Sequence, residues 1–258
     1  MMKKRNINLI LFSIFLAFLI SLPILCVDRY LSHPDIPWQL APFNADSLSH
    51  IYKEKYTQLG SDALILSIQD SSRPVVMVLV DGWGVPYDES LLDDDFAKFN
   101  KDKIVFSLHK RLLQRTTYAE NVEYKQGFIN GILLETGDST TCAEKDREQG
   151  SHFKQTLCCI NCDDIQALAT LDSLTKDGSW KRIAWTTRET REGDRGKLHT
   201  MLQELSKMAT KHPNIQFVIQ GAHRPILGAP DTRRKYLAPW VPAVFVNCSL
   251  KEFDATRN

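Results

Sequence analysis

The sequence predicts an α/β domain with a mostly parallel sheet flanked by helices, preceded by one N-terminal transmembrane helix. The first observation is a continuous β-branched run, VVMVLV at 75–80, which is typical of a strand buried on both faces. The second is that similar short apolar runs recur later in the chain. The third is that patterns with helical spacing lie between them, and strands that alternate with helices are typical of a parallel sheet.

The expected elements follow one another along the chain. A polar, helix-compatible stretch around 47–58 comes first. Strands are expected at 75–80, 182–185, 215–220 and 242–247. Helices are expected at 105–115, 163–174 and 197–209, and the last has apolar residues at 198, 201, 202, 205 and 208, the spacing of one helix face.

Composition excludes several classes of protein. The chain has 258 residues, of which 43% are hydrophobic and 24% charged, so it is not expected to be disordered, collagen-like or a small disulfide scaffold. The 32 basic and 31 acidic residues give a formal net charge of +1, so no nucleic-acid partner is expected.

The N-terminus predicts a membrane anchor. Residues 7–25 form an uncharged apolar run, and Lys3, Lys4 and Arg5 precede it. The run is long enough to cross a hydrocarbon core of about 30 Å as a helix. The basic tip is expected to stay in the cytoplasm, which places the rest of the chain outside, in the periplasm or the extracellular space. A cleaved signal peptide is the alternative, although Pro23–Leu25 offers no small-residue cleavage site; both interpretations export the domain.

Three regions are therefore expected along the chain. They are the cytoplasmic tip and anchor (or signal peptide) at 1–26, a stalk and leading helix at 27–73, and the α/β domain at 74–258. The cysteine run at 158–162, C-C-x-x-C, predicts a disulfide rather than half of a zinc site, because no second Cys/His pair follows at matching spacing.

Polar residues follow two of the predicted strands, at the edge where the functional groups of an open α/β sheet gather. Asp81 ends the run at 75–80, and a carboxylate there suits a metal ion; capping of the following turn is the alternative. His223 follows the strand at 215–220, where a structural role is the alternative to a metal ligand.

A third polar segment, Gly137–Glu144, is rich in hydroxyl groups. Thr141 and Glu144 have capping-box spacing, so a helix is expected to start here. The helix dipole favours anions at this end, and a hydroxyl beside it is placed to attack phosphorus or sulfur. The candidate nucleophiles are Ser139, Thr140 and Thr141.

Taken in this order, the three segments resemble the alkaline phosphatase superfamily, in particular the sulfatase-like branch that includes lipoteichoic acid synthase and the phosphoglycerol and phosphoethanolamine transferases. In that branch an acidic residue ends the first strand, a Thr at a helix start before an Ala-Glu pair is the nucleophile, and a late strand runs into a G-D-H-x-P-P motif. The matching residues are Asp81, Thr140 ahead of Ala143-Glu144, and G-A-H-R-P at 221–225. The resemblance implies that Thr140 is the nucleophile and that Asp81 and His223 bind a divalent metal, zinc or manganese.

Two departures from the family pattern bear on the metal. Ala222 stands where the family has a metal-binding Asp, and Arg191 stands where the middle strand is expected to carry a His. Arg188, Arg191 and Arg224 would instead form an anion site, because guanidinium groups bind phosphate bidentately without a metal.

Two functions are compatible with these residues. The first is an active, membrane-anchored enzyme that uses a metal to hydrolyse or transfer phosphate-ester groups on a lipid or glycan. The second is a catalytically degenerate family member, a pseudoenzyme, that needs no metal and binds an anionic glycan, a lipid head group or a partner protein.

Overall fold

The computed structural model describes residues 48–60, 62–99, 104–128, 130–137, 153–190, 193–225, 232 and 235–251. The apolar run at 7–25 lies outside these residues. Within the described ranges, no helix has the length and apolar character needed to span a membrane. The compact unit that contains the sheet spans Asp46–Asn258, so it begins before residue 74, the start of the domain expected from the sequence.

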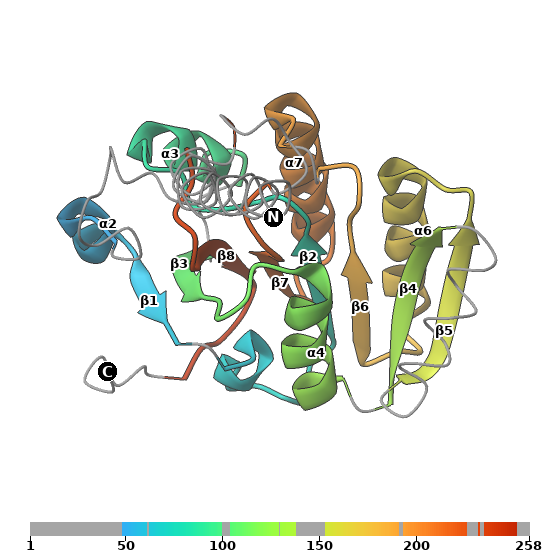
Figure 1. Cartoon of the computed structure of the whole chain (residues 1–258). Helices are drawn as coiled ribbons and strands as arrows, with labels where there is room; N and C mark the ends of the chain where they lie inside the picture. The colour runs from blue at the N-terminus through green and yellow to red at the C-terminus, as the bar shows by residue number, and fades with distance from the viewer. Residues whose placement is uncertain are drawn as a thin grey trace, which may run out of the picture. The chain divides into compact units, whose positions relative to one another are not determined.

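The centre of the domain is an eight-stranded mixed sheet (Figure 1). The strand order is β1-β3-β8-β7-β2-β6-β4-β5, and among these strands β8 alone runs antiparallel to its neighbours. The bounds are β1 Thr57–Leu59, β2 Val75–Val80, β3 Ile104–Lys110, β4 Gly131–Gly137, β5 Phe153–Ile160, β6 Arg182–Thr186, β7 Gln216–Gly221 and β8 Trp240–Val246. The prediction of a mostly parallel α/β sheet is confirmed.

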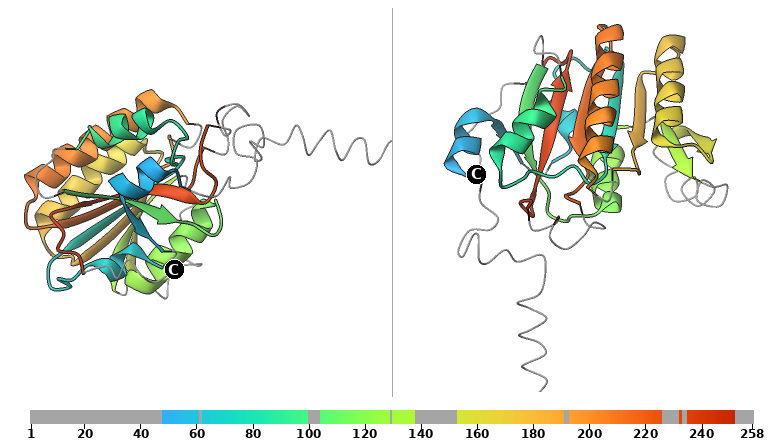
Figure 2. Two further views of the ribbon diagram at one scale, coloured as in Figure 1. Left: turned by 90° about the vertical axis from the view of Figure 1, so that its left-hand side faces the viewer. Right: turned by 90° about the horizontal axis from the view of Figure 1, so that it is seen from above.

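Helices cover both faces of this sheet (Figure 2). Their bounds are α2 His50–Lys55, the 3-10 helix η1 Leu64–Ser67, α3 Glu89–Phe96, α4 Thr116–Gly127, α6 Asp164–Asp177 and α7 Arg195–Lys211. Apolar side chains of α3, α6 and α7 join one hydrophobic cluster, and those of η1 and α4 join a second cluster on the opposite face.

The central strand β2 shows why its sequence is a continuous apolar run. Val76, Val78 and Val80 belong to the first cluster, whereas Val75, Met77 and Leu79 belong to the second. Successive side chains of a strand point to opposite faces, so a strand with helices on both sides needs apolar residues at every position. All six are buried.

The predicted strands and the two later predicted helices are confirmed within one to three residues at each end. The helix predicted at 105–115 is wrong, because residues up to Lys110 form β3, paired with β1 on one side and β8 on the other. The spacing of apolar residues in this short segment is compatible with a helix and with a strand. The segment forms a strand because β1 and β8 provide hydrogen-bond partners for its backbone N–H and C=O groups. The sequence did not predict β1, β4, β5, η1, α3 or α4.

Candidate active site

The candidate site lies at the carboxyl edge of the sheet, where β2 and β7 end side by side. The two strands are parallel neighbours, and Val80 is paired with Gly221. Asp81 and Ala222-His223 therefore leave the sheet at the same level. A side chain at Gly221 would collide with the carbonyl oxygen of Trp83, so only glycine lets the two loops approach this closely.

Two threonines after β6 hold the backbone of Asp81. The Asp81 N–H donates to the Thr187 hydroxyl at 3.2 Å, and the Thr190 hydroxyl donates to the Asp81 carbonyl oxygen. The two hydroxyls also lie 3.2 Å apart within hydrogen-bond reach. All three residues are buried, so these contacts fix the direction in which Asp81 leaves its strand.

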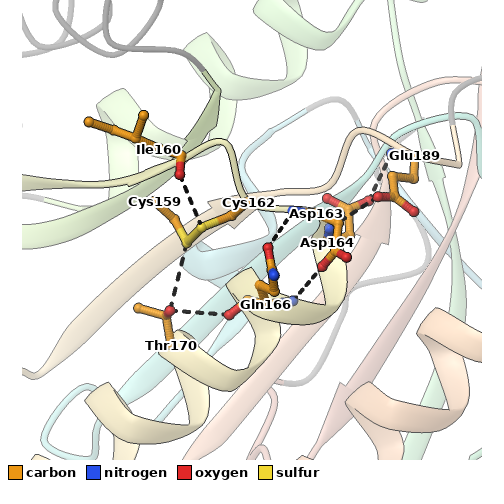
Figure 3. The surroundings of a disulfide bond; sticks show 8 residues. All are labelled: Cys159, Ile160, Cys162, Asp163, Asp164, Gln166, Thr170 and Glu189. Carbon is orange, nitrogen blue, oxygen red and sulfur yellow. Dashed lines mark hydrogen bonds between the residues drawn. A yellow bond between two sulfur atoms is a disulfide. The ribbon is translucent and has the colours of Figure 1, made fainter.

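The start of α6 fixes the loop that carries the two threonines (Figure 3). The Asp164 carboxylate accepts hydrogen bonds from the backbone N–H groups of Arg188 and Glu189, and burial raises its pKa. Just before α6, a disulfide joins Cys159 to Cys162, which confirms the predicted disulfide. Asp164 and the loop at 187–190 thus form one connected support for Asp81, and the disulfide lies two residues before Asp164 in the chain.

A third residue, Thr116, completes the cluster. It is the first residue of α4, after an extended Arg115, and no described side chain caps this helix start. The Thr116 hydroxyl donates to Asp81 Oδ1 at 2.9 Å and lies 3.1 Å from His223 Nε2. Asp81 Oδ1 and His223 Nε2 are 3.4 Å apart, with both side chains fully buried. Thr116 is half-buried, whereas Asp81 and His223 are fully buried, so Thr116 is the most exposed residue of the cluster.

A backbone contact sets the tautomer of His223. Its Nδ1 lies 2.6 Å from the carbonyl oxygen of Arg224. A carbonyl oxygen only accepts, so Nδ1 carries the proton in this contact, and Nε2 is the nitrogen that faces Thr116 and Asp81. Metal-binding histidines are commonly oriented by the same kind of contact.

The cluster fits a divalent metal ion with open positions. No three His, Cys, Asp or Glu side chains are grouped for a metal within the described ranges. Asp81, His223 and Thr116 nevertheless bring a carboxylate oxygen, an imidazole nitrogen and a hydroxyl oxygen within 2.9–3.4 Å of one another. Ligand atoms bound tetrahedrally at about 2.1 Å from zinc are separated by about 3.4 Å. Ala222 is fully buried and supplies no carboxylate, so these three donors include one acid fewer than the resemblance implies.

The sequence missed Thr116 for an identifiable reason. The pattern Thr-x-x-Ala-Glu occurs twice, at Thr116–Glu120 and at Thr140–Glu144, and the sequence alone does not distinguish the two copies. Ser139, Thr140 and Thr141 lie outside the described residues, as does Arg191, so their predicted roles stay predictions. The first copy of the pattern is the sequence signal that points to Thr116.

The two described arginines of the predicted anion site lie in different surroundings. Arg188 forms an ion pair of 3.2 Å with the buried Glu135, which balances its charge. Arg224 follows His223 directly and is 5% exposed, with its backbone N–H donating to Gln114.

A buried ionic contact holds α4 against the sheet two turns beyond Thr116. Glu123 accepts hydrogen bonds from Arg111 at 3.0 Å, from Gln220 at 2.8 Å and from the backbone N–H of Leu64 at 2.8 Å. Burial raises the pKa of Glu123 and lowers that of Arg111. Because Gln220 lies on β7, this contact ties the helix that carries Thr116 to the strand that precedes His223.

Comparisons with known proteins agree with this architecture. No protein-family model matches the chain, and no curated protein matches it in sequence. Among solved structures, a protein of the alkaline phosphatase superfamily from Vibrio parahaemolyticus superposes with a TM-score of 0.50 at 11% identity, covering 72% of this chain. The chain spans 62% of the length of that protein.

Two further structures are similar at TM-scores below 0.5. The phosphoglycerol transferase GacH from Streptococcus pyogenes gives 0.45 at 11% identity, with 74% of this chain and 73% of that one covered. The lipoteichoic acid synthase LtaP from Listeria monocytogenes gives 0.42 at 9% identity, with 67% and 65% covered. The match to the Vibrio protein, together with the mostly parallel sheet and its flanking helices, shows that the chain has the fold of the alkaline phosphatase superfamily.

Proposed function

We propose that this protein is an exported, membrane-anchored enzyme that hydrolyses or transfers phosphate-ester groups on a lipid or glycan, with Thr116 as the nucleophile. One observation carries the proposal: the Thr116 hydroxyl, at the start of α4, lies between Asp81 and His223. The apolar run at 7–25 would anchor the chain in the membrane, with its basic tip in the cytoplasm and the domain outside.

In the proposed reaction, Thr116 is the nucleophile and Asp81 accepts its proton. The Thr116 oxygen attacks phosphorus as its proton passes to the Asp81 carboxylate, the group to which it donates in the structure. The new O–P bond replaces the bond to the leaving alcohol, which takes a proton from solvent. Water or an acceptor hydroxyl then attacks the phosphothreonine and releases a proton to solvent, while Thr116 recovers its proton from Asp81.

The start of α4 contributes to binding the phosphate. The first backbone N–H groups of a helix point outward, and the helix dipole favours negative charge at this end. Since no described side chain caps α4, these groups would donate to the phosphate oxygens as negative charge develops. Zinc or manganese held by Asp81, His223 and Thr116 would supply Lewis-acid stabilisation of that charge, and the Thr116 proton would then pass to solvent, because the Asp81 oxygen would be bound to the metal.

Hydrolysis of p-nitrophenyl phosphate and bis(p-nitrophenyl) phosphate by the full chain in detergent, with manganese or zinc, tests the proposal. Thr116→Ala should lower kcat by about a hundredfold or more, and Thr116→Ser should retain activity. The neighbouring Thr117 is exposed, so Thr117→Ala is the matched control and should change kcat by less than about twofold. Loss of activity in Thr140→Ala but not in Thr116→Ala would show that the nucleophile is Thr140.

The second candidate is a pseudoenzyme that binds an anionic glycan, a lipid head group or a partner protein without a metal. The buried Ala222, in place of a metal-binding acid, favours it. This candidate predicts no hydrolysis with either metal and retained binding of glycerol phosphate, measured by calorimetry. Hydrolysis that depends on Thr116 would exclude it.

A further inference from the structure

The loop between β3 and α4 exposes two leucines beside the candidate site. We call residues Lys110–Arg115 the leucine loop. Leu112 is 67% exposed and Leu113 is 54% exposed, and no other large apolar side chain in the described ranges is as exposed as Leu112. Single exposed apolar residues are common, but two in succession beside a reactive hydroxyl need an explanation.

Hydrogen bonds fix the backbone on both sides of the two exposed leucines. Before them, the Arg111 N–H donates to the Pro239 carbonyl at 2.6 Å, and its buried guanidinium contacts Glu123. After them, the Gln114 side chain accepts from the Arg224 N–H at 2.8 Å. Leu112 and Leu113 therefore lie between two anchored residues, which lowers the entropy lost when they bind a surface.

The charged residues beside the leucines indicate what kind of surface the leucine loop would bind. Lys110 and Arg115 are exposed at the two ends of the leucine loop. Ile160 and Ile165 are exposed at the far end of the same sheet edge, but there Asp163 is exposed too. An apolar tip flanked by basic residues complements a bilayer with anionic headgroups, since the leucines enter the acyl boundary while the cations meet the headgroups.

We propose that the leucine loop inserts into the surface of an anionic lipid bilayer. The apolar run at 7–25, as the proposed membrane anchor, would bring the protein to a membrane. Thr116 follows Leu113 by three residues, so insertion would present lipid headgroups to the candidate nucleophile. Insertion into the bilayer depends only on the leucine loop. The idea that insertion selects a lipid substrate rests on the proposed function.

Photocrosslinking of the full chain in nanodiscs tests the insertion. Leu113→p-benzoylphenylalanine places a photoreactive group in the leucine loop, and Leu66→p-benzoylphenylalanine is the matched control. Leu66 is also exposed, at 47%, but it lies in η1 beside the amino-terminal end of the sheet. Each variant is irradiated in nanodiscs of phosphatidylcholine and in nanodiscs of an equal mixture of phosphatidylcholine and phosphatidylglycerol, and lipid adducts are counted by mass spectrometry.

The expected adduct yield at 113 in the mixed nanodiscs exceeds the yield at 66 by about tenfold or more. Omitting phosphatidylglycerol, or adding Lys110→Gln and Arg115→Gln, should lower the yield at 113 by about threefold or more. Equal adduct yields at 113 and 66 would overturn the inference. So would a yield at 113 that stays the same both without phosphatidylglycerol and with Lys110→Gln and Arg115→Gln. Crosslinking needs no catalysis, so adding Thr116→Ala to the variant at 113 should leave its adduct yield unchanged. The crosslinking result can therefore fail or succeed independently of the proposed function.

Discussion

The Thr116 hydroxyl donates a hydrogen bond of 2.9 Å to the carboxylate of Asp81, a residue 35 positions earlier in the chain. Between them the chain forms α3, crosses the sheet as β3 and turns into α4. His223 reaches the same hydroxyl from β7. Three segments that are distant in sequence therefore meet at one oxygen atom, which belongs to the most exposed residue of the three.

The two threonines that hold Asp81 should affect both catalysis and stability. Thr190→Val removes the hydroxyl that donates to the Asp81 carbonyl but keeps the side-chain shape. We expect the free energy of unfolding to fall by about 1–2 kcal/mol and kcat for p-nitrophenyl phosphate to fall by about tenfold, with little change in KM. Thr200→Val, on the exposed face of α7, is the control and should be nearly neutral in both. A kcat unchanged by Thr190→Val would show that Asp81 needs no such support.

Restoring the missing acid should strengthen metal binding. Ala222→Asp adds a carboxylate directly before His223, where the side chain is fully buried. Without metal, the buried charge should lower the melting temperature, and zinc or manganese should restore it. Calorimetry should show metal binding tighter by about tenfold or more than in the natural chain. The control Ala222→Asn adds similar bulk without charge, and equal metal affinity in the two variants would contradict this expectation.

The buried ion pair under α4 gives a prediction with a defined pH dependence. Arg111→Met leaves Glu123 buried without its cation, which should lower the free energy of unfolding by about 3–5 kcal/mol near neutral pH. Burial already raises the pKa of Glu123, and removal of Arg111 raises it further. A raised folded-state pKa means that stability is lost as the pH rises above the unfolded value, so the loss should be smaller near pH 5 than near pH 7.

Adding Glu123→Gln to this variant provides the control, because the amide keeps an oxygen for the Leu64 N–H and carries no charge. The double variant should recover most of the lost stability in urea unfolding, and its remaining loss should not depend on pH. A loss of equal size in both variants would mean that packing, not charge, is responsible.

Cys248 should be an unreactive thiol in the folded protein. Burial raises its pKa to about 12, so almost none of it is thiolate near pH 8.5. Iodoacetamide should therefore alkylate Cys248 only after unfolding in urea, as measured by peptide mass spectrometry. Rapid labelling of Cys248 without denaturant would contradict the raised pKa. Because the folded state favours the protonated thiol, Cys248 stabilises the fold below the unfolded pKa of about 8.5, and this contribution is lost as the pH rises above it.

Strands and helices whose sequence patterns fit one type of element were predictable before the structure. The run at 75–80 became β2, because a strand covered on both faces needs an apolar side chain at every position. The helices α6 and α7 were predictable from their apolar spacing, and Asp163 and Asp194 cap their first turns. Asp81 and His223 were predictable because they lie one and two residues beyond the ends of β2 and β7.

The tertiary structure decided what local patterns left open. Residues 105–110 have an apolar spacing that fits a helix, and they form β3 because β1 and β8 lie on either side to pair with it. Thr116 and Thr140 begin the same five-residue pattern, and the fold places Thr116 between Asp81 and His223. The sequence shows which residue types are present. Which of them lie close together depends on the order and register of the strands, because these bring together segments that are far apart in the chain.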